Sequence, residues 1–218
     1  MAINIALDGP SAAGKSTIAK RLAKKLKYVH LDTGAMYRCV AYKALETGVN
    51  TEDENALCAM IRSTEIELKS DGTILLDGNV VTNEIRTDRI SMGASNVSAF
   101  KEVRALLVAQ QQKMARNKGY IMDGRDIGTV VLPDAELKIF MTASAEARGE
   151  RRYKENLSKG FESDLNQIIE EIKARDWQDT HREHSPLKKA DDAVVLDTSK
   201  MNIDEVVSAI EALLPSEK

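Results

Sequence analysis

The 218-residue sequence predicts an α/β fold of three layers, in which helices cover both faces of a parallel sheet. Short apolar runs alternate with helical patterns along most of the chain, and this alternation is typical of strand–helix–strand units. A glycine-rich segment links the first apolar run to the first helical pattern. Residues 62–85 depart from the alternation and predict a small antiparallel β insert, because charged and apolar residues alternate there between turns.

The amino-terminal part of the chain predicts two strand–helix pairs. An apolar run at 3–7 predicts a buried strand. A helix at 15–26 follows, because Ile18, Leu22 and Leu26 recur at i, i+4 and i+8. A second strand at 28–31 and a helix from 36 to about 48 come next. The basic residues beside the apolar stripe of the first helix are expected to face solvent: Lys20, Arg21, Lys24 and Lys25.

The insert is preceded by a helix that we expect to reach about Ser63, because Thr51 and Glu54 form a capping-box pattern. Three short apolar runs follow at 66–68, 74–76 and 80–81, with turn residues between them at 70–72 and 77–79. Runs of this length separated by tight turns predict an antiparallel meander.

The rest of the chain returns to the strand–helix pattern. It predicts, in order, helices at 87–98 and 100–117, strands at 120–122 and 137–141, helices at 145–159 and 164–177, and a strand at 193–196. Asn202 and Glu205 form a capping box for the final helix, and residues 215–218 are expected to fray.

Composition excludes several classes of partner. The formal net charge is -3 and only 4% of residues are aromatic, so we expect neither nucleic acid nor a membrane surface as a partner. The two cysteines form no metal-ligand or disulfide pattern, and the amino terminus does not resemble an export signal. We therefore expect a cytoplasmic protein.

The glycine-rich segment GPSAAGKS at 9–16 fits the phosphate-binding P-loop pattern and lies between a strand and a helix, as that motif requires. Lys15 is expected to reach the outer phosphates and to have no structural partner without nucleotide, while the Ser16 hydroxyl can ligate Mg²⁺. Asp123 ends a strand, either as a second magnesium-site carboxylate or as a structural residue. The predicted ATP-binding residues are Gly9, Pro10, Ser11, Ala12, Ala13, Gly14, Lys15, Ser16 and Thr17.

Arginines at strand–helix junctions indicate a second anion site. The stretch LDTGAMYR at 31–38 predicts a sharp turn at Gly34, with Arg38 on the first turn of the next helix. Arg125 follows another strand. Two further sets, Arg148 with Arg151 and Arg152, and Arg175 with Asp179 and Arg182, each share one helical face. A hydrolase or switch needs one such arginine, whereas a kinase must also hold an anionic acceptor.

Six segments together resemble the bacterial cytidylate kinase family, in the same order over essentially the whole chain. They are GPSAAGKST at 9–17, LDTGAMYR at 31–38, NEIRT at 83–87, MDGRDIGTVVLPDA at 122–135, Arg175-Asp176 and VLDT at 195–198. The resemblance implies phosphoryl transfer from ATP to CMP or dCMP with Mg²⁺, on a P-loop fold. It also leads us to expect a monomer, as most such kinases are. It also implies a core (about 1–34, 118–145 and 178–218), a monophosphate-binding subdomain with the insert (about 35–117) and a short lid (about 146–165).

The resemblance also assigns roles to residues. Asp126 matches the position that faces the cytosine amino group, and Thr33 keeps a hydroxyl where many relatives have serine. The implied catalytic residues are Lys15, Arg125, Arg148, Arg151, Arg152 and Arg182. The implied CMP-binding residues are Thr33, Arg38, Ser95, Arg104, Arg125, Asp126, Arg175, Asp179 and Arg182. His30, His181 and His184 are expected to have surface or packing roles, because the phosphate acceptor is already anionic.

Two other readings use the same P-loop. One is a kinase for another small acceptor, such as a different nucleoside monophosphate or a metabolite hydroxyl. A hydroxyl acceptor would need a catalytic base, and Asp32 is a candidate. A nucleotide-dependent switch without transfer would need loops that respond to hydrolysis, and the sequence offers none apart from the lid.

Overall fold

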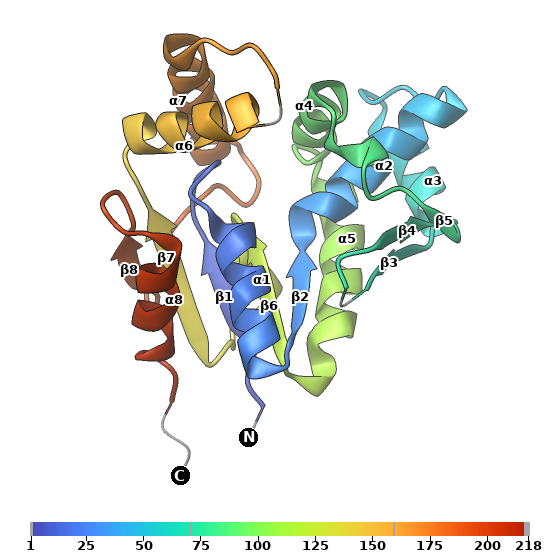
Figure 1. The fold of residues 1–218 in the computed structure, drawn as a ribbon. Coiled ribbons are helices and arrows are strands. Elements are labelled where there is room, and N and C mark those ends of the chain that lie inside the picture. The colour runs from blue at the N-terminus through green and yellow to red at the C-terminus, as the bar shows by residue number, and fades with distance from the viewer. Residues whose placement is uncertain (1, 70, 159, 216–218) are drawn as a thin grey trace.

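A fully parallel sheet of five strands forms the centre of the molecule (Figure 1). The computed structural model describes residues 2–69, 71–158 and 160–215. The strand order is β2-β6-β1-β7-β8, and the bounds are β1 Ile5–Asp8, β2 Val29–Asp32, β6 Tyr120–Gly124, β7 Leu137–Thr142 and β8 Val194–Asp197. The parallel sheet predicted from the alternation is confirmed, with each strand within two residues of its predicted position at either end.

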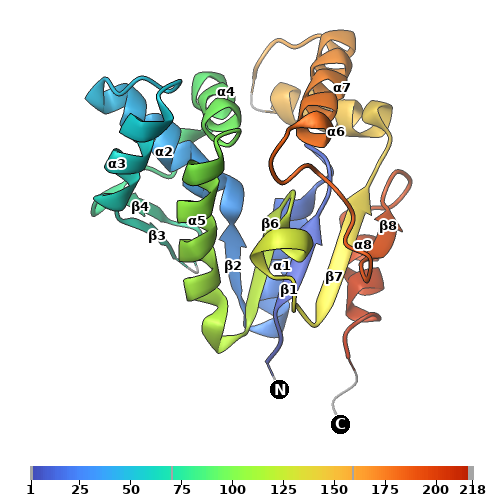
Figure 2. The ribbon, with the colours of Figure 1, turned by 180° about the vertical axis from the view of Figure 1, so that it is seen from behind.

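Helices cover both faces of this sheet. Helices α1 (Lys15–Leu26) and α8 (Ile203–Glu211) lie on one face, where Ile18 and Ile210 pack with Ile121. The opposite face is covered by α5 (Lys101–Met114) and by the short helical turn η3 (Ile127–Val131), as Figure 2 shows. Burial on both faces explains why the central strands β1, β6 and β7 are nearly continuous apolar runs.

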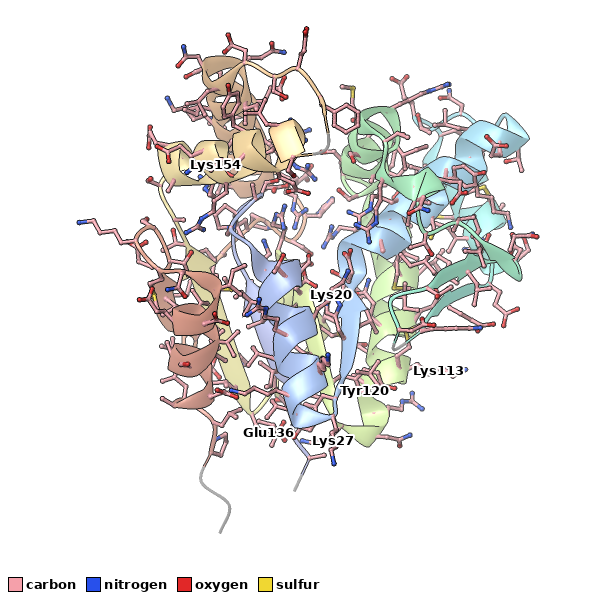
Figure 3. The ribbon with its side chains drawn as sticks, in the orientation of Figure 1. Lys20, Lys27, Lys113, Tyr120, Glu136 and Lys154 are labelled. Atoms are coloured by element: carbon pink, nitrogen blue, oxygen red, sulfur yellow. The ribbon has the colours of Figure 1, made fainter. Side chains whose placement is uncertain are left out.

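The exposed side of α1 is basic, as predicted. Figure 3 shows Lys20 on this helix and Lys27 just after it, away from the carboxyl ends of the strands. Arg21 and Lys25 of the same side pair with Asp204 and Glu211 of α8.

The β insert is confirmed as an antiparallel sheet of three short strands. They are β3 Ile66–Leu68, β4 Ile74–Leu76 and β5 Asn79–Val80, which follow α3 (Glu54–Arg62). Lys43 of the adjoining helix donates hydrogen bonds to Thr64 and Asp77, and these contacts join the insert to that helix. The single turn η1 (Glu84–Arg86) and α4 (Asp88–Val97) connect the insert to α5, which η2 (Ala115–Asn117) follows.

Three predicted features reach beyond the described residues. They are the first residue of the turn at 70–72, the last residue of the helix predicted at 145–159, and residues 216–218 of the tail.

The turn predicted in LDTGAMYR is wrong. Helix α2 (Thr33–Thr47) begins directly after β2, and Asp32 caps it by accepting from the Ala35 N–H at 3.0 Å. Gly34 is therefore helical. A side chain at this position would crowd the Asp32–Arg38 pair, because a Cβ there would lie 3.2 Å from Asp32 Oδ1 and 3.3 Å from Arg38 Nη1. Because the helix starts at Thr33, Arg38 lies on its second turn rather than its first.

One predicted cap is wrong and one is confirmed. Helix α3 is capped by Asp53, whose side chain accepts from the Ala56 N–H, while Glu54 accepts from the Glu102 N–H of α5. Glu54 is thus engaged in a tertiary contact that the capping-box pattern could not reveal. At α8, Asn202 and Glu205 form the predicted capping box.

Helices α6 (Ala145–Ser158) and α7 (Leu165–His181) pack together above the carboxyl ends of the strands (Figure 1). Helix α7 continues four residues beyond its predicted end at 177, so Asp179 is helical. Arg182 lies just past the helix in extended conformation, and the shared helical face therefore holds for Arg175 and Asp179 only. Among the described helices, none combines the length and apolarity that a membrane crossing requires.

Candidate active site

The P-loop occupies the junction between β1 and α1. Gly9 has a φ of +147°, and a Cβ at this position would lie 2.0 Å from the Met141 carbonyl oxygen of β7, so only glycine fits. Gly14 takes the left-handed conformation immediately before α1, which leaves the first N–H groups of that helix without a side-chain cap. A helix start of this kind is suited to bind phosphate oxygens.

Lys15 is buried and folded back onto the loop. Its Nζ donates to the Gly9 and Pro10 carbonyl oxygens, both at 2.7 Å, so the expectation that it lacks a structural partner is wrong. Burial, with the positive charge of Arg125, lowers the pKa of Lys15 to about 7, although the carboxylates of Asp123 and Asp8 oppose this shift. The loop itself therefore holds the lysine through two of its own carbonyl oxygens.

Asp123 lies beside Ser16 at the carboxyl end of β6. Ser16 Oγ donates to Asp123 Oδ2 at 2.6 Å, and His30 Nε2 contacts Asp123 Oδ1 at 2.5 Å. Burial opposes ionisation of Asp123, but the hydrogen bonds from His30 and Ser16 and the charge of Lys15 hold its pKa below the usual value. The expectation of a surface or packing role missed this contact of His30.

This pair of oxygen donors fits Mg²⁺. A hydroxyl and an ionised carboxylate are hard ligands of the type that magnesium takes, usually together with waters and substrate phosphates. Within the residues that the structure describes, no cluster of three or more histidine, cysteine or acidic side chains could hold a metal ion.

Asp8, at the end of β1, holds the backbone that follows β6, and the sequence analysis did not identify this residue. Its Oδ1 accepts from the Ile127 N–H at 2.8 Å and its Oδ2 accepts from the Gly128 N–H at 2.7 Å. Burial raises the pKa of Asp8 to about 6, even though these two hydrogen bonds favour the carboxylate. The contacts fix the start of η3, and hence the segment that carries Arg125 and Asp126.

Four arginines near the carboxyl ends of the strands have side-chain nitrogens that make no hydrogen bond among the described residues. In the described part of the chain, five buried side-chain nitrogens have no hydrogen-bond partner, and four of them are arginine nitrogens. They belong to Arg38, Arg104, Arg175 and Arg182, and the fifth to Gln111. Because buried donors are normally satisfied, this concentration indicates a place for an anionic ligand.

Asp179 and Asp32 hold two of the predicted arginines. Arg125 Nε donates to Asp179 Oδ2 at 2.7 Å, and Arg38 Nη2 donates to Asp32 Oδ2 at 2.6 Å. Burial, followed by the charge of Arg125, lowers the pKa of Arg175, and Arg38 and Arg152 act in the same direction. The structure thus brings these arginines within electrostatic reach of one another.

A second group of predicted residues surrounds Asp126. Arg104 forms a buried ion pair with Asp126 and lies over the Tyr37 ring, 5.4 Å from its centroid. Burial and the charge of Arg104 lower the pKa of Arg182, while Asp126 opposes this. Thr33 is also buried, and its Oγ1 donates to the Asp123 carbonyl oxygen at 2.8 Å.

The three arginines of α6 differ in their surroundings. Arg148 is buried, and it donates to the Ala143 and Ser11 carbonyl oxygens and to both carboxylate oxygens of Asp176. Arg151 donates to the hydroxyl and the carbonyl of Thr198. Arg148 therefore ties the P-loop to α7, whereas Arg151 and Arg152 line the cleft described next.

A cleft of about 1700 Å³ extends from the P-loop between the α6–α7 pair and α4. Residues 11–14 of the P-loop, Ser95, Arg151, Arg152 and Arg175 are among the residues that line it. Ser95 Oγ donates to Gln178 Oε1 of α7 at 3.2 Å, across this cleft. The other predicted acceptor-site and lid residues are not part of its lining: Thr33, Arg38, Arg104, Arg125, Asp126, Arg148, Asp179 and Arg182.

A parallel sheet with a P-loop, a Ser16–Asp123 hydrogen bond and a cluster of arginines near the same edge is the arrangement expected of a P-loop kinase. The profile of one protein family, cytidylate kinase, matches residues 5–216. The chain is 52% identical over 211 residues to a cytidylate kinase of Bacillus pumilus, and the aligned region covers 95% of this chain and 94% of that relative. The chain belongs to the cytidylate kinase family.

A second relative and two solved structures are also similar to this chain. A cytidylate kinase of Caldicellulosiruptor saccharolyticus is 51% identical over 211 residues, covering 95% of this chain and 93% of the relative. Shikimate kinase from Bacteroides thetaiotaomicron superposes with a TM-score of 0.50 at 11% identity, covering 98% of each chain. An uncharacterised protein from Eubacterium ventriosum gives 0.57 at 12% identity, covering 100% of each. These structural similarities show the fold alone.

Proposed function

We propose that the protein transfers the terminal phosphoryl group of ATP to CMP or dCMP, producing ADP and CDP or dCDP. The observation that carries this proposal is that four arginines near the carboxyl ends of the strands, Arg38, Arg104, Arg175 and Arg182, have buried side-chain nitrogens without a hydrogen-bond partner among the described residues. A kinase that acts on a nucleoside monophosphate needs both sites, because donor and acceptor are anions. Membership of the cytidylate kinase family supports cytosine as the acceptor base.

The donor site would be the P-loop. Its N–H groups would cradle the phosphates of ATP, and Lys15 would leave the Gly9 and Pro10 carbonyls for the outer phosphates. Ser16 and Asp123 would hold Mg²⁺, which neutralises phosphate charge when it is bound.

The acceptor base would lie near Asp126. A carboxylate suits the cytosine amino group, which is a donor, and the guanidinium of Arg104 suits the acceptor edge of the base. Thr33 and Ser95 would complete this side of the site with hydroxyl groups, and Asp179 would lie near the ribose.

The acceptor phosphate would be held by guanidinium groups: Arg38, Arg125, Arg175 and Arg182. Bidentate hydrogen bonds from arginine match the geometry of a phosphate. Closure of α6 would bring Arg151 and Arg152 towards the transferring group, with Arg148 linking the lid to the P-loop. No catalytic base is required, because the attacking oxygen is already ionised.

Two alternatives are less well supported. A kinase for a neutral hydroxyl acceptor would use Asp32 as its base, but one oxygen of Asp32 caps α2 and the other holds Arg38. A nucleotide-dependent switch needs one arginine for hydrolysis and has no need for the arginines assigned above to the acceptor phosphate.

The same proposal includes the organisation and setting of the protein. The core would comprise about 1–34, 118–145 and 178–218, with a monophosphate-binding subdomain at about 35–117 and a lid at about 146–165. We propose a cytoplasmic monomer that acts on small nucleotides, and its net charge of -3 gives no basic field for nucleic acid.

A panel of acceptors tests the proposal. Release of ADP from MgATP would be measured with CMP, dCMP, UMP, AMP, GMP and a set of small hydroxyl metabolites. We expect turnover with CMP and dCMP to exceed that with the purine monophosphates by a factor of about 100 or more, since unpaired polar groups in the base pocket cost several kcal/mol. Equal turnover with a hydroxyl acceptor would favour the Asp32 reading, and ADP release independent of any acceptor would favour a switch.

A further inference from the structure

His30 contacts the magnesium side of the site although it belongs to neither the P-loop nor the arginine groups. Its side chain is 10% exposed, and its Nε2 lies 2.5 Å from Asp123 Oδ1. Asp123 is itself 5% exposed, and an ionised carboxylate can only accept hydrogen bonds. His30 Nε2 must therefore be the donor in this contact.

The sheet register explains how the imidazole reaches this carboxylate. Strand β2 pairs with β6 so that His30 lies beside Ile121, and Asp123 follows two residues later on the same face of the sheet. That face packs against α1, which begins at Lys15 and brings Ser16 to the other carboxylate oxygen. The imidazole thus approaches Asp123 from β2 while the serine approaches from α1.

The two contacts restrain the carboxylate. Oδ1 is held by His30 and Oδ2 by Ser16, so rotation about the Cβ–Cγ bond would break both hydrogen bonds. A carboxylate with only the serine contact could turn away when that hydroxyl moves towards a ligand. Groups that bond to metal-ligating side chains orient them and affect metal affinity.

We propose that His30 is a positioning residue, which orients Asp123 so that its carboxylate and Ser16 together receive the magnesium ion of MgATP. The inference rests on the proposed ATP-binding site, but it does not depend on the identity of the phosphoryl acceptor. His30 touches neither phosphate nor the reacting atoms in this arrangement, and it acts through Asp123.

Binding measurements without an acceptor test this role. Affinity for ATP would be determined by titration calorimetry in excess Mg²⁺ and again in EDTA, for wild type, His30→Leu and His30→Gln. We expect His30→Leu to reduce the gain in affinity that Mg²⁺ provides by about tenfold, with affinity in EDTA unchanged. His30→Gln should recover most of this gain, because its amide nitrogen can donate from nearly the position of Nε2.

Controls separate positioning from a structural effect. His181→Gln removes an exposed histidine of α7 and should leave both affinities unchanged. Thermal unfolding of each variant shows whether it is folded, and His30→Gln keeps the test available if His30→Leu is not. Equal losses of affinity in Mg²⁺ and in EDTA, or an unchanged magnesium gain in His30→Leu, would overturn the proposal. Failure of wild type to use CMP would instead reject the proposed acceptor and leave this result standing.

Discussion

Lys15 shows how a single buried residue links charge to ligand binding. Its pKa is lowered to about 7 by burial and by Arg125. Lys15 is therefore partly neutral at slightly alkaline pH, and the phosphates of ATP should restore its proton. We expect uptake of roughly half a proton or more when ATP binds at pH 7.5, and an ATP affinity that falls as pH rises through 7.

Titration calorimetry in buffers of different ionisation enthalpy measures this uptake directly. Lys15→Ala should lose both the uptake and phosphoryl transfer while remaining folded, and Lys20→Ala, on the exposed side of α1, should retain both. An enthalpy of ATP binding that does not vary with the buffer would contradict the prediction.

We expect Asp126 to discriminate between cytosine and uracil. Asp126→Asn keeps the shape but replaces an acceptor-only group by one that also donates, so the mutant tolerates the UMP carbonyl in place of the CMP amino group. A charged hydrogen bond contributes about 1.5–3 kcal/mol, and we therefore expect CMP binding to weaken ten- to a hundredfold. The ratio of kcat/KM for CMP to that for UMP checks this, and an unchanged ratio would remove Asp126 from the base pocket.

Arg38 is held in place by Asp32 and keeps a buried nitrogen free of hydrogen bonds among the described residues. Arg38→Lys retains the charge but loses the planar fork, so we expect a higher KM for CMP and a lower kcat, with nearly unchanged ATP binding. Calorimetry with each nucleotide distinguishes the sites: equal losses for ATP and CMP would assign Arg38 to the donor site or to the fold.

At the scale of elements, the start of helix α3 depends on Asp53 rather than on the predicted capping box. The Asp53 side chain accepts from the Ala56 N–H at 3.0 Å, whereas the Glu54 carboxylate accepts from the Glu102 N–H of α5. Asp53→Ala should lower the free energy of unfolding by about 1 kcal/mol in urea titrations, and Thr51→Ala should change it by much less. A larger loss in the free energy of unfolding for Thr51→Ala than for Asp53→Ala would support the predicted capping box instead.

At the scale of the whole molecule, the parallel sheet gathers acidic residues at one edge. Asp32 of β2 lies level with Asp123 of β6, and Asp8 of β1 lies level with Gly124. Because neighbouring strands end at the same height, residues from three distant parts of the chain meet beside the P-loop. Binding sites of open α/β sheets occur at this carboxyl edge for the same reason.

This edge should also affect how stability varies with pH. Burial raises the pKa of Asp8 to about 6 from 3.8, so the folded state binds its proton more tightly than the unfolded state. The stabilisation from Asp8 is present below about pH 4 and is lost as pH rises through 6. We expect the stability of wild type relative to Asp8→Asn to decrease by up to roughly 3 kcal/mol between pH 4 and 7.

Urea titrations of both proteins across this range test the sign. The comparison removes the opposite contribution of the carboxylates whose pKa values are lowered, such as Asp179, because they are common to both proteins. A difference in stability that stays constant with pH would show that Asp8 does not titrate in this window.

The sequence by itself determined the features that depend on contiguous residues. Apolar periodicity located the strands and most helices, the spacing of GPSAAGKS identified the P-loop, and alternation between turns identified the β insert. The family segments identified the cytidylate kinase family, which the comparisons confirm. All of these are short-range patterns, in which backbone geometry and side-chain spacing act over a few residues.

Only the tertiary structure decided which distant residues meet. His30 reaches Asp123 across 93 residues of chain, Asp8 reaches Gly128 across 120, and Arg148 reaches Ser11 across 137. These pairs are set by strand register and by packing of α6 on α7, which no local pattern encodes. The same reason explains the error at Glu54, whose carboxylate accepts from the Glu102 N–H of the distant helix α5. The error at Gly34 has a local cause, because Asp32, two residues earlier, caps α2 and starts the helix at Thr33.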